Sequence, residues 1–350
     1  MAKSMNIAGK PVGTGHPVFI CAELSGNHGG VYGRAEALVN AAARAGADAV
    51  KLQLYTPDTL TLDSDAPPFR IMWQERERTL YDLYAEAATP WEWYPPLKAL
   101  AESLGMACFA SVFDSASVDF LATYDCPAYK IASFELVDIP LIRYAMSKHK
   151  PVILSTGMAT YDEIAEAVLS VWGKGAGTRL ILLKCTSAYP APPEDANLRT
   201  IKDMARLLHC PVGLSDHTLG IAVPVAAVAL GACMIEKHLT LSCADGGPDA
   251  AFSLEPAEFA AMVEAVRVAE RALGMARYGP TESERANLRF RRSLFIVADV
   301  AAGEPFTAAN VRSIRPAAGL LPKHLPDVLG KQAARDVKRG TPLSWDLLVC

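Results

Sequence analysis

Short apolar runs alternate with amphipathic stretches along the first 280 residues of the chain. A short run of β-branched and other apolar residues is typical of a buried strand, and apolar positions spaced three and four apart are typical of a helix. The pattern predicts strands at residues 18–22, 49–54, 107–111, 128–132, 152–155, 179–184, 211–215 and 232–235. The helices that it predicts between these strands include residues 34–45, 116–123, 161–172, 221–230 and 256–273.

Eight alternating strand and helix units predict a (β/α)8 TIM barrel, an α/β fold, over residues 1–280. In this fold the catalytic groups lie at the C-terminal ends of the strands. The connection between the second and third strands, residues 55–105, is long and carries an aromatic group at Trp91, Trp93 and Tyr94. A connection of this length predicts a flap over the mouth of the barrel.

The pattern changes after Pro280. Residues 281–292 are charged and hold four arginines, which predicts a solvated linker. Within residues 293–350, the segment 300–307 recurs as the segment 337–344, with valine, glycine and proline at the same positions. This repeat predicts a small β-rich domain with pseudo-twofold symmetry. A domain of this size has little core of its own, so packing on the barrel would stabilise it.

The composition narrows the class of protein. Hydrophobic residues make up 51% of the 350 residues, enough for a large core, and the net charge of −4 gives no case for nucleic acid as a partner. The N-terminus lacks the apolar run of a signal peptide, and no long uncharged apolar stretch predicts a membrane span. The eight cysteines contain no CxxC pair. We therefore expect a soluble, reduced, cytoplasmic protein with no membrane partner.

Two histidines occupy matching places, since His217 and His238 each follow a short apolar run. Imidazole is the commonest metal-binding side chain, and the ends of successive barrel strands lie close together. A single histidine at a strand end is more simply a hydrogen-bonded structural residue, but a matching pair favours a metal. Two imidazoles leave positions open for water and substrate oxygen, which suits Lewis-acid catalysis by Mn²⁺, Mg²⁺ or Co²⁺.

Lysines inside the apolar strands give a second signal. Lys51, Lys130 and Lys184 would be costly to bury unless each ammonium group meets an anion or reaches water. Hydroxyl groups follow the same strands, at Ser133, Ser155, Thr186, Ser187 and Ser215. Together they predict a cradle for a small dianion such as phosphate or a carboxylate. Lys237 alternates away from His238, so we expect it to face the helices.

Eight segments of the chain resemble the sialic acid synthase family, whose members join phosphoenolpyruvate to an N-acylated amino sugar. They are residues 22–28, 51–53, 127–133, 155–158, 213–218, 236–238, 247–249 and 253–256. The C-terminal segment resembles the family's antifreeze-like (SAF) domain. Residues 23–25, 184–191, 251–254 and 319–323 are similar to the branch that makes pseudaminic acid. Val112 and Ala317 depart from the pattern, which has proline and glycine there.

The resemblance implies a role for each candidate residue. It implies that His217 and His238 hold a divalent metal ion and that Glu23 and Glu135 transfer protons or orient water. It implies that phosphoenolpyruvate is bound by Lys51, Lys130, Ser133, Ser155, Ser187 and Ser215. It implies that the sugar is bound by Gln53, Tyr189, Asp249 and Arg315. It also implies a homodimer in which the SAF domain reaches the partner's active site through Arg315.

The implied reaction is a transfer in which phosphoenolpyruvate, 2,4-diacetamido-2,4,6-trideoxy-β-L-altrose and water give pseudaminic acid and phosphate by C–O cleavage. We expect Phe252, Leu320 and the flap tryptophans to provide apolar surface for the methyl and acetyl groups of this sugar. The nearest alternatives are synthesis of N-acetylneuraminate or N,N'-diacetyllegionaminate. A metal-dependent aldolase or hydrolase and a non-catalytic carbohydrate-binding protein are alternatives of other classes, since the fold alone does not fix the reaction.

Overall fold

The computed structural model describes residues 4–73, 76–172 and 179–349. The chain forms two compact units, Met1–Gly274 and Met275–Cys350. The first unit holds the barrel and the second holds the small β-rich domain. No helix within the described residues is both long enough and apolar enough to cross a membrane.

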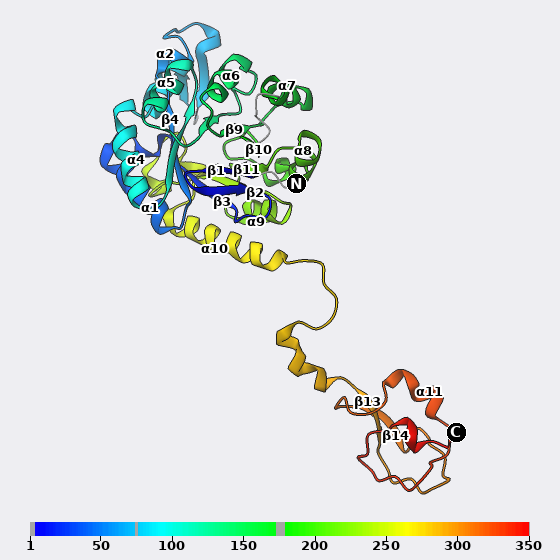
Figure 1. Ribbon diagram of the computed structural model, residues 1–350. Coiled ribbons are helices and arrows are strands. Elements are labelled where there is room, and N and C mark those ends of the chain that lie inside the picture. The colour runs from blue at the N-terminus through cyan, green and yellow to red at the C-terminus, as the bar shows by residue number, and fades with distance from the viewer. Residues whose placement is uncertain (1–3, 74–75, 173–178, 350) are drawn as a thin grey trace. The chain divides into compact units, whose positions relative to one another are not determined.

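Eight parallel strands close into a barrel, which confirms the predicted TIM fold (Figure 1). The closing pair is β12 with β3, in which Ile235 lies opposite Ile20. Most of these strands are buried on both faces, which explains why they appear in the sequence as apolar runs rather than alternating patterns. Their order around the barrel is β3 (Phe19–Glu23), β4 (Ala49–Leu54), β7 (Ala107–Val112), β8 (Tyr129–Ile131), β9 (Val152–Ser155), β10 (Leu180–Cys185), β11 (Val212–Asp216) and β12 (Met234–His238).

Helices follow the strands and pack around the barrel. Polar caps fix where several of them begin: Asp114 accepts from the N–H of Ser117, and Thr160 accepts from the N–H of Glu163. These caps also fix the loops that leave the C-terminal ends of the strands, where the site is built. The main helices are α1 (Tyr32–Arg44), α4 (Tyr94–Ser103), α5 (Ser115–Thr123), α6 (Ile139–Ser147), α7 (Tyr161–Val171), α8 (Thr200–Leu208), α9 (Ala222–Ala229) and α10 (Pro256–Leu273).

A hairpin that the sequence pattern did not predict precedes the barrel. Strands β1 (Ser4–Ile7) and β2 (Lys10–Gly13) pair antiparallel, and Ile7 and Val12 are fully buried in the barrel's apolar core. Each strand has only four residues, too few for a period-two pattern to stand out.

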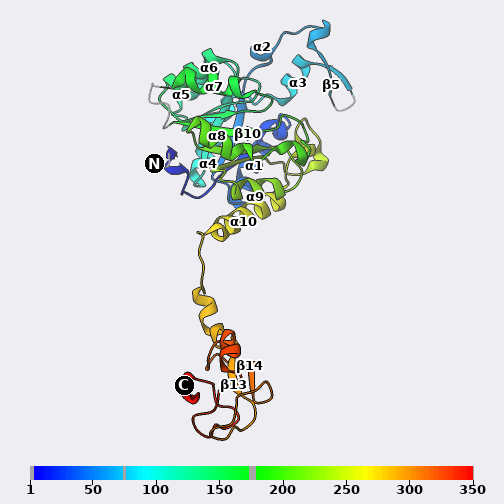
Figure 2. The same ribbon diagram turned by 90° about the vertical axis from the view of Figure 1, so that its right-hand side faces the viewer.

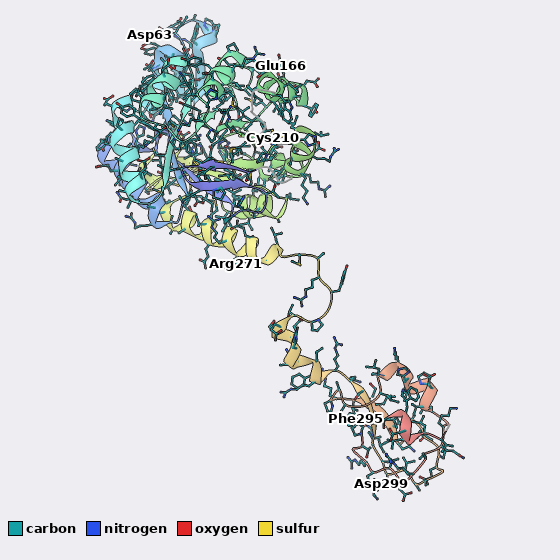
Figure 3. The ribbon with its side chains drawn as sticks, in the orientation of Figure 1. Asp63, Glu166, Cys210, Arg271, Phe295 and Asp299 are labelled. Atoms are coloured by element: carbon teal, nitrogen blue, oxygen red, sulfur yellow. The ribbon has the colours of Figure 1, made fainter. Side chains whose placement is uncertain are left out.

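The flap, residues 55–105, has secondary structure of its own, and its segments Pro57–Leu60, Arg70–Trp73 and Leu80–Ala87 project at one end of the barrel (Figure 2). Its tip is an antiparallel hairpin in which Arg70 lies opposite Thr79. Asp63 in the flap and Arg271 near the end of α10 lie at opposite ends of the unit (Figure 3). The elements before α4 are α2 (Pro57–Leu60), β5 (Arg70–Trp73), β6 (Arg76–Thr79), α3 (Leu80–Ala87) and the 3-10 helix η3 (Trp91–Trp93).

The C-terminal unit has an apolar core of its own, built around the sequence repeat. The valines that start the two copies pair antiparallel: Val300 N–H donates to Val337 O at 2.9 Å, and Val337 N–H donates to Val300 O at 2.8 Å. Phe306 and Leu343, at equivalent positions, are fully buried. The unit also contains β13 (Ser293–Ile296) and β14 (Val311–Ile314), and the exposed residues Glu282–Phe290 before them form a 3-10 helix. The repeat therefore places the two copies symmetrically, as predicted.

Close packing between β11 and its neighbours predicts that Gly213 tolerates no side chain. A β-carbon there would lie 2.5 Å from the backbone oxygen of Met234 and 2.8 Å from Cδ2 of Leu183. Gly213→Ala should therefore destabilise the barrel by about 1–3 kcal/mol, measured by urea unfolding. Gly33→Ala in α1 is the control, because a β-carbon there meets nothing within 4 Å. Equal unfolding midpoints for the two variants would contradict this prediction.

Candidate active site

A cavity of about 370 Å³ opens at the C-terminal ends of the barrel strands. Seven of the eight strands contribute a lining residue, or two, from near their ends. These residues are Lys51 and Gln53 from β4, Ser111 from β7, Lys130 from β8, Ser155 from β9, Cys185 from β10, Ser215 from β11, and Glu236 and His238 from β12. Loops add Ser25, Ser133, Glu135, Tyr189, His217 and Asp249. Most of the candidate residues predicted from the sequence thus surround one space.

One network joins four buried charged residues at the strand ends, which we name the barrel floor: Glu23, Lys51, Lys130 and Glu236. Lys51 Nζ lies 2.5 Å from Glu23 Oε2, 3.3 Å from Glu236 Oε2 and 3.1 Å from Ser111 Oγ. Lys130 Nζ lies 4.0 Å from Glu236 Oε1 and donates to its neighbour's backbone oxygen. These four charged side chains are almost completely buried, so each depends on its opposite-charge partners.

The pKa values on the barrel floor reflect this balance between burial and charge. Burial lowers the pKa of Lys51 to about 8, although the Glu236 carboxylate opposes the shift. Burial alone would raise the pKa of Glu236, but the positive charges of Lys130 and Lys51 hold it below its ordinary value. Glu236 is therefore ionised at neutral pH, and the two lysines face two carboxylates.

Near the lysines, several serine hydroxyl groups can form further hydrogen bonds. The Oγ atoms of Ser155 and Ser187 are buried without a hydrogen-bond partner, and Ser133 Oγ accepts from the N–H of Gly157 at 3.0 Å. A β-carbon on Gly157 would lie 2.2 Å from Ser187 Oγ, so only glycine leaves room for this cluster. Ser215 differs, because its hydroxyl donates to Glu236 at 2.9 Å. We name Lys51, Lys130, Ser133, Ser155 and Ser187 the anion cradle; all of them except Ser187 line the cavity.

The two histidines lie side by side, with ring centroids 5.3 Å apart. Nδ1 of His217 lies 2.9 Å from the backbone oxygen of Thr186, which can only accept, so Nδ1 carries a proton and Nε2 is the ring nitrogen left for another partner. Nδ1 of His238 is buried without a partner. Burial lowers the pKa of His238 well below its ordinary value, and a neutral imidazole is the form that binds metals.

No third His, Cys, Asp or Glu completes a metal-binding group with this pair within the part of the chain that the structure describes. The two imidazoles could therefore hold a metal ion only in a site that leaves most positions to water and substrate, as catalytic sites do. The unpartnered Nδ1 of His238 fits such a role, since a buried polar atom normally has a partner. Phe252 packs edge-on against both rings, at 5.8 and 4.9 Å.

A chain of hydrogen bonds organises the other side of the cavity. Gln53 Nε2 donates to Ser25 Oγ at 2.9 Å, and Ser25 Oγ donates to Asp249 in a short hydrogen bond. The backbone N–H of Ser25 donates to Glu23 at 2.8 Å. These hydrogen bonds use the amide nitrogen of Gln53 and one carboxyl oxygen of Asp249. The amide oxygen of Gln53 and the other oxygen of Asp249 can accept hydrogen bonds from hydroxyl or N–H groups of a sugar.

Glu135 is the candidate acid–base group with the clearest perturbation. It lines the cavity, and its Oε2 is buried without a hydrogen-bond partner. Burial raises its pKa to about 7, although the charge of Lys130 opposes the shift. A carboxyl group with a pKa near neutrality can both give and accept a proton at physiological pH.

One prediction from the sequence is wrong: Lys184 does not belong to the anion cradle. Its Nζ donates to the backbone oxygen of Cys185 at 2.8 Å, and it does not line the cavity. Cys185 lines the cavity instead, since successive strand residues face opposite sides. The same alternation sends Lys237 away from the cavity, as predicted, into an ion pair with Asp216 at 2.6 Å.

Two titratable residues that line the cavity, Glu236 and Cys185, received no role in the prediction from the sequence. Glu236 shares the face of His238, but nothing in the sequence reveals that it pairs with lysines from two other strands. Cys185 lies 3.9 Å from Nδ1 of His217. Burial raises its thiol pKa, but hydrogen bonds to His217 and Ser133 and the charges of His217 and Lys130 together outweigh burial and lower the pKa to about 7.

The apolar surface of the cavity also differs from the prediction. Trp91 and Trp93 do not line it: Trp93 packs against His28 and Tyr32, with ring centroids 5.3 and 5.5 Å away, and both tryptophans pack on the barrel core. Phe252 supports the histidines without lining the cavity, and Leu320 packs on the core of the C-terminal unit. The flap contributes other apolar residues instead: Leu60, Ile71, Leu80, Leu83, Tyr84 and Ala87.

Arg315 lies in the C-terminal unit, where it is exposed directly after β14. Its predicted contact with a second subunit concerns a partner chain, so it stays a prediction. His28, in the motif after β3, is structural. Its Nε2 lies 3.0 Å from Thr89 Oγ1, and its Nδ1 accepts from the N–H of Gly30 at 3.0 Å.

Comparison with known proteins assigns the family. The NeuB family model matches residues 38–278, and the SAF domain model matches residues 291–349. The chain therefore belongs to the NeuB family. It is 45% identical to the pseudaminic acid synthase of Campylobacter jejuni, covering 94% of this chain and 96% of that protein. It is 42% identical to the pseudaminic acid synthase of Helicobacter pylori, covering 94% and 97%.

A solved structure shares the architecture. The N-acetylneuraminic acid (sialic acid) synthetase from Leptospira borgpetersenii superposes with a TM-score of 0.73 at 32% identity. The match covers 83% of this chain and 97% of that chain.

The raised pKa of Glu135 predicts a pH-dependent stability. Its folded-state pKa of about 7 lies above the ordinary value of 4.5, so the stability gained from its protonation is present at low pH and lost as the pH rises through 7. Glu135→Gln should remove that loss. The free energy of unfolding of the variant relative to wild type should rise by about 1–2 kcal/mol between about pH 5 and pH 8.

The measurement is calorimetric or urea unfolding at each pH. Glu166→Gln is the control, because Glu166 lies on the exposed face of α7 (Figure 3). A difference between Glu135→Gln and wild type that is constant with pH would refute the assignment of a raised pKa.

Proposed function

We propose that this protein condenses phosphoenolpyruvate with 2,4-diacetamido-2,4,6-trideoxy-β-L-altrose and water to give pseudaminic acid and phosphate. The observation that carries the proposal is the anion cradle beside a histidine pair, in a chain that aligns almost end to end with pseudaminic acid synthases. Synthesis of N-acetylneuraminate or N,N'-diacetyllegionaminate is the alternative within the family. The buried lysines and unpartnered hydroxyls count against a non-catalytic carbohydrate-binding protein, and the family counts against an aldolase.

The anion cradle is the proposed site for phosphoenolpyruvate. Lys51 and Lys130 would donate charge-assisted hydrogen bonds to its phosphate and carboxylate, and the free hydroxyls of Ser155 and Ser187 would donate to their oxygens. Buried donors without partners are the signature of a site completed by its ligand, because an unsatisfied polar group is costly. Gln53, Tyr189 and Asp249 would hold the sugar on the other side of the cavity.

The proposed reaction forms one C–C bond and breaks one C–O bond. C3 of phosphoenolpyruvate attacks the aldehyde carbon of the open-chain sugar, and the aldehyde oxygen takes up a proton. Water adds to the positive carbon at C2 and loses a proton. The resulting tetrahedral intermediate collapses by cleavage of the bond between C2 and the phosphate oxygen, which releases phosphate and leaves a nine-carbon 2-keto acid.

Glu135 and Glu23 are the proposed proton-transfer residues. The pKa of about 7 lets Glu135 exchange a proton with the sugar oxygen or with water at neutral pH. Glu23 does not itself line the cavity, but Lys51 and the N–H of Ser25 hold it in a fixed orientation beside two residues that do.

His217 and His238 are the proposed ligands of a divalent metal ion, with Mn²⁺, Mg²⁺ or Co²⁺ as candidates. When bound, such an ion polarises the aldehyde and makes its carbon electrophilic. The charges of the barrel floor support this proposal. Lys51 and Lys130 are balanced by Glu23 and Glu236, so an incoming polyanion needs further positive charge at the site.

We propose further that the protein acts as a homodimer in which Arg315 binds acyl oxygens in the partner's cavity, as the family resemblance implies. The exposure of Arg315 and its planar, bidentate guanidinium group suit this role. We also propose a cytoplasmic location. Six cysteines form no disulfide, which is typical of a reducing compartment: Cys21, Cys108, Cys126, Cys185, Cys233 and Cys243.

The anion cradle predicts a substrate-selective defect in Lys130→Ala. Loss of a charge-assisted contact worth about 1.5–3 kcal/mol should raise the KM for phosphoenolpyruvate at least tenfold and change the KM for the sugar much less. Lys184→Ala is the matched control, because Lys184 is the strand lysine that faces away from the cavity. Steady-state kinetics with each substrate varied would reveal the split. Equal effects on both KM values would indicate a structural lysine.

The histidine pair predicts reversible metal dependence. Chelation should abolish turnover, and Mn²⁺ should restore it. His238→Ala should bind no Mn²⁺ in a calorimetric or electron-paramagnetic titration while it keeps its unfolding temperature. His209→Ala, on a histidine outside the cavity, should bind Mn²⁺ as wild type does. Full activity in a chelated sample, together with no Mn²⁺ site in the titration, would refute the metal proposal.

The choice of sugar tests the proposed function directly. The diacetamido altrose should exceed N-acetylmannosamine in kcat/KM by at least tenfold, on the order of 1.4 kcal/mol. The apolar flap residues in the cavity support this preference, because a hydroxyl group placed there loses its hydrogen bonds to water. The measurement is phosphate release with each sugar and phosphoenolpyruvate. A preference for N-acetylmannosamine or for the diacetamido mannose analogue would assign the chain to another branch of the family.

A further inference from the structure

One wall of the cavity is apolar and comes entirely from the flap. Leu60, Ile71, Leu80 and Leu83 line the cavity, and they are joined there only by Tyr84 and Ala87 from the described residues between 56 and 88. We name the first four residues the flap wall. They come from α2, β5 and α3, three elements that the sequence pattern did not resolve.

The flap wall contrasts with the other surfaces of the cavity. The barrel strands and the loops after them offer ammonium, carboxylate, hydroxyl and imidazole groups. In contrast, no charged residue of the described flap lines the cavity. The charged flap residues pair with one another elsewhere: Arg70 with Glu77 at 3.0 Å and Arg78 with Glu86 at 2.6 Å. The described flap therefore contributes only uncharged side chains to the cavity, and the barrel strands and their loops contribute the charged ones.

Contacts at its base fix the flap wall on the barrel. Tyr55, at the end of β4, packs edge-on against Tyr84 and Phe113, with ring centroids 5.9 and 5.1 Å apart. The His28–Thr89 hydrogen bond and a close approach between Gly26 and Ala87 hold the segment after α3. The wall thus belongs to an anchored element, and a surface of fixed shape can select among substrates.

We propose that the flap wall is the specificity element for the end of the sugar farthest from the reacting aldehyde, and that it selects an apolar substituent there, as in a 6-deoxy sugar. This inference rests on the proposed function. Because C1 must meet phosphoenolpyruvate at the anion cradle, the other end of an open-chain sugar points away from the polar floor. The flap wall supplies all the leucine and isoleucine side chains that line the cavity in the described part of the chain. A methyl group is buried favourably against such side chains, and a hydroxyl group is left there without a partner.

The experiment uses two sugars that differ only at C6: the 2,4-diacetamido-2,4,6-trideoxy altrose and its 6-hydroxy analogue. The full-length protein should favour the 6-deoxy sugar by about 10- to 100-fold in kcat/KM, the range in which an apolar pocket discriminates against an added hydroxyl group. Leu80→Asn and Ile71→Asn should each lower that ratio at least fivefold. The KM for phosphoenolpyruvate should stay within twofold of wild type.

Two matched controls come from the same segment. Leu62→Asn and Met72→Asn make the same change at residues that are 63% and 68% exposed and lie outside the cavity, so both should keep the wild-type ratio. Unfolding temperatures show whether each variant is folded, and Leu80→Ala replaces any asparagine variant that is not. A ratio that stays unchanged in the folded flap-wall variants would overturn the proposal.

This outcome is separable from a failure of the proposed function. If the wild-type protein turns over neither altrose derivative, the proposed substrate is wrong. The same variants are then tested with the 6-hydroxy and 6-deoxy forms of whichever amino sugar is turned over. A loss of C6 discrimination in the flap-wall variants supports the specificity role, and unchanged discrimination overturns it.

Discussion

The structure of the site depends on the buried ion network around Lys51. Its ammonium group lies between Glu23 at the end of β3 and Glu236 on β12, so it links three strands, including the pair that closes the barrel. Burial of these charges is tolerable only because each meets a partner. The same pairs hold the carboxylates in fixed positions around the cavity. Barrel closure and the arrangement of the reacting groups thus rest on the same contacts.

This network also explains why the barrel floor stays polar when the barrel is filled with apolar side chains. Lys51 and Lys130 sit on strands whose other residues are almost all buried and apolar. Replacing such a network by apolar residues is often neutral or stabilising in proteins, so stability alone does not account for it. The unpartnered hydroxyls of Ser155 and Ser187 nearby strengthen the point, because they gain nothing in the free protein. The floor is arranged for a ligand, at some cost to the fold.

The sequence predicted the barrel well and the site only in part, for physical reasons. A buried strand needs an apolar run, so the runs revealed all eight strands, and the predicted ends differ from the observed ones by three residues at most. For β12, predicted at residues 232–235 and observed at Met234–His238, the polar Glu236, Lys237 and His238 concealed the end. Lys184 was misassigned because the facing of a strand residue depends on its register, which Cys185 reveals only in the structure. The pKa of Glu135 depends on burial that no motif encodes.

The flap is a second place where the sequence did not predict which residues face the cavity, and this matters for specificity. Tryptophans in a long connection suggested a sugar-binding surface, but Trp91 and Trp93 are large apolar residues that gain more by packing on the barrel. The smaller residues Leu60 and Leu80 face the cavity, and nothing in their sequence distinguishes them from the exposed Leu62. Chemistry in this fold is carried by rigid strand ends, whose residues form recognisable motifs. Selectivity depends on the flap, whose packing only a structure gives. Members of one family can therefore share a reaction and differ in the sugar that they accept.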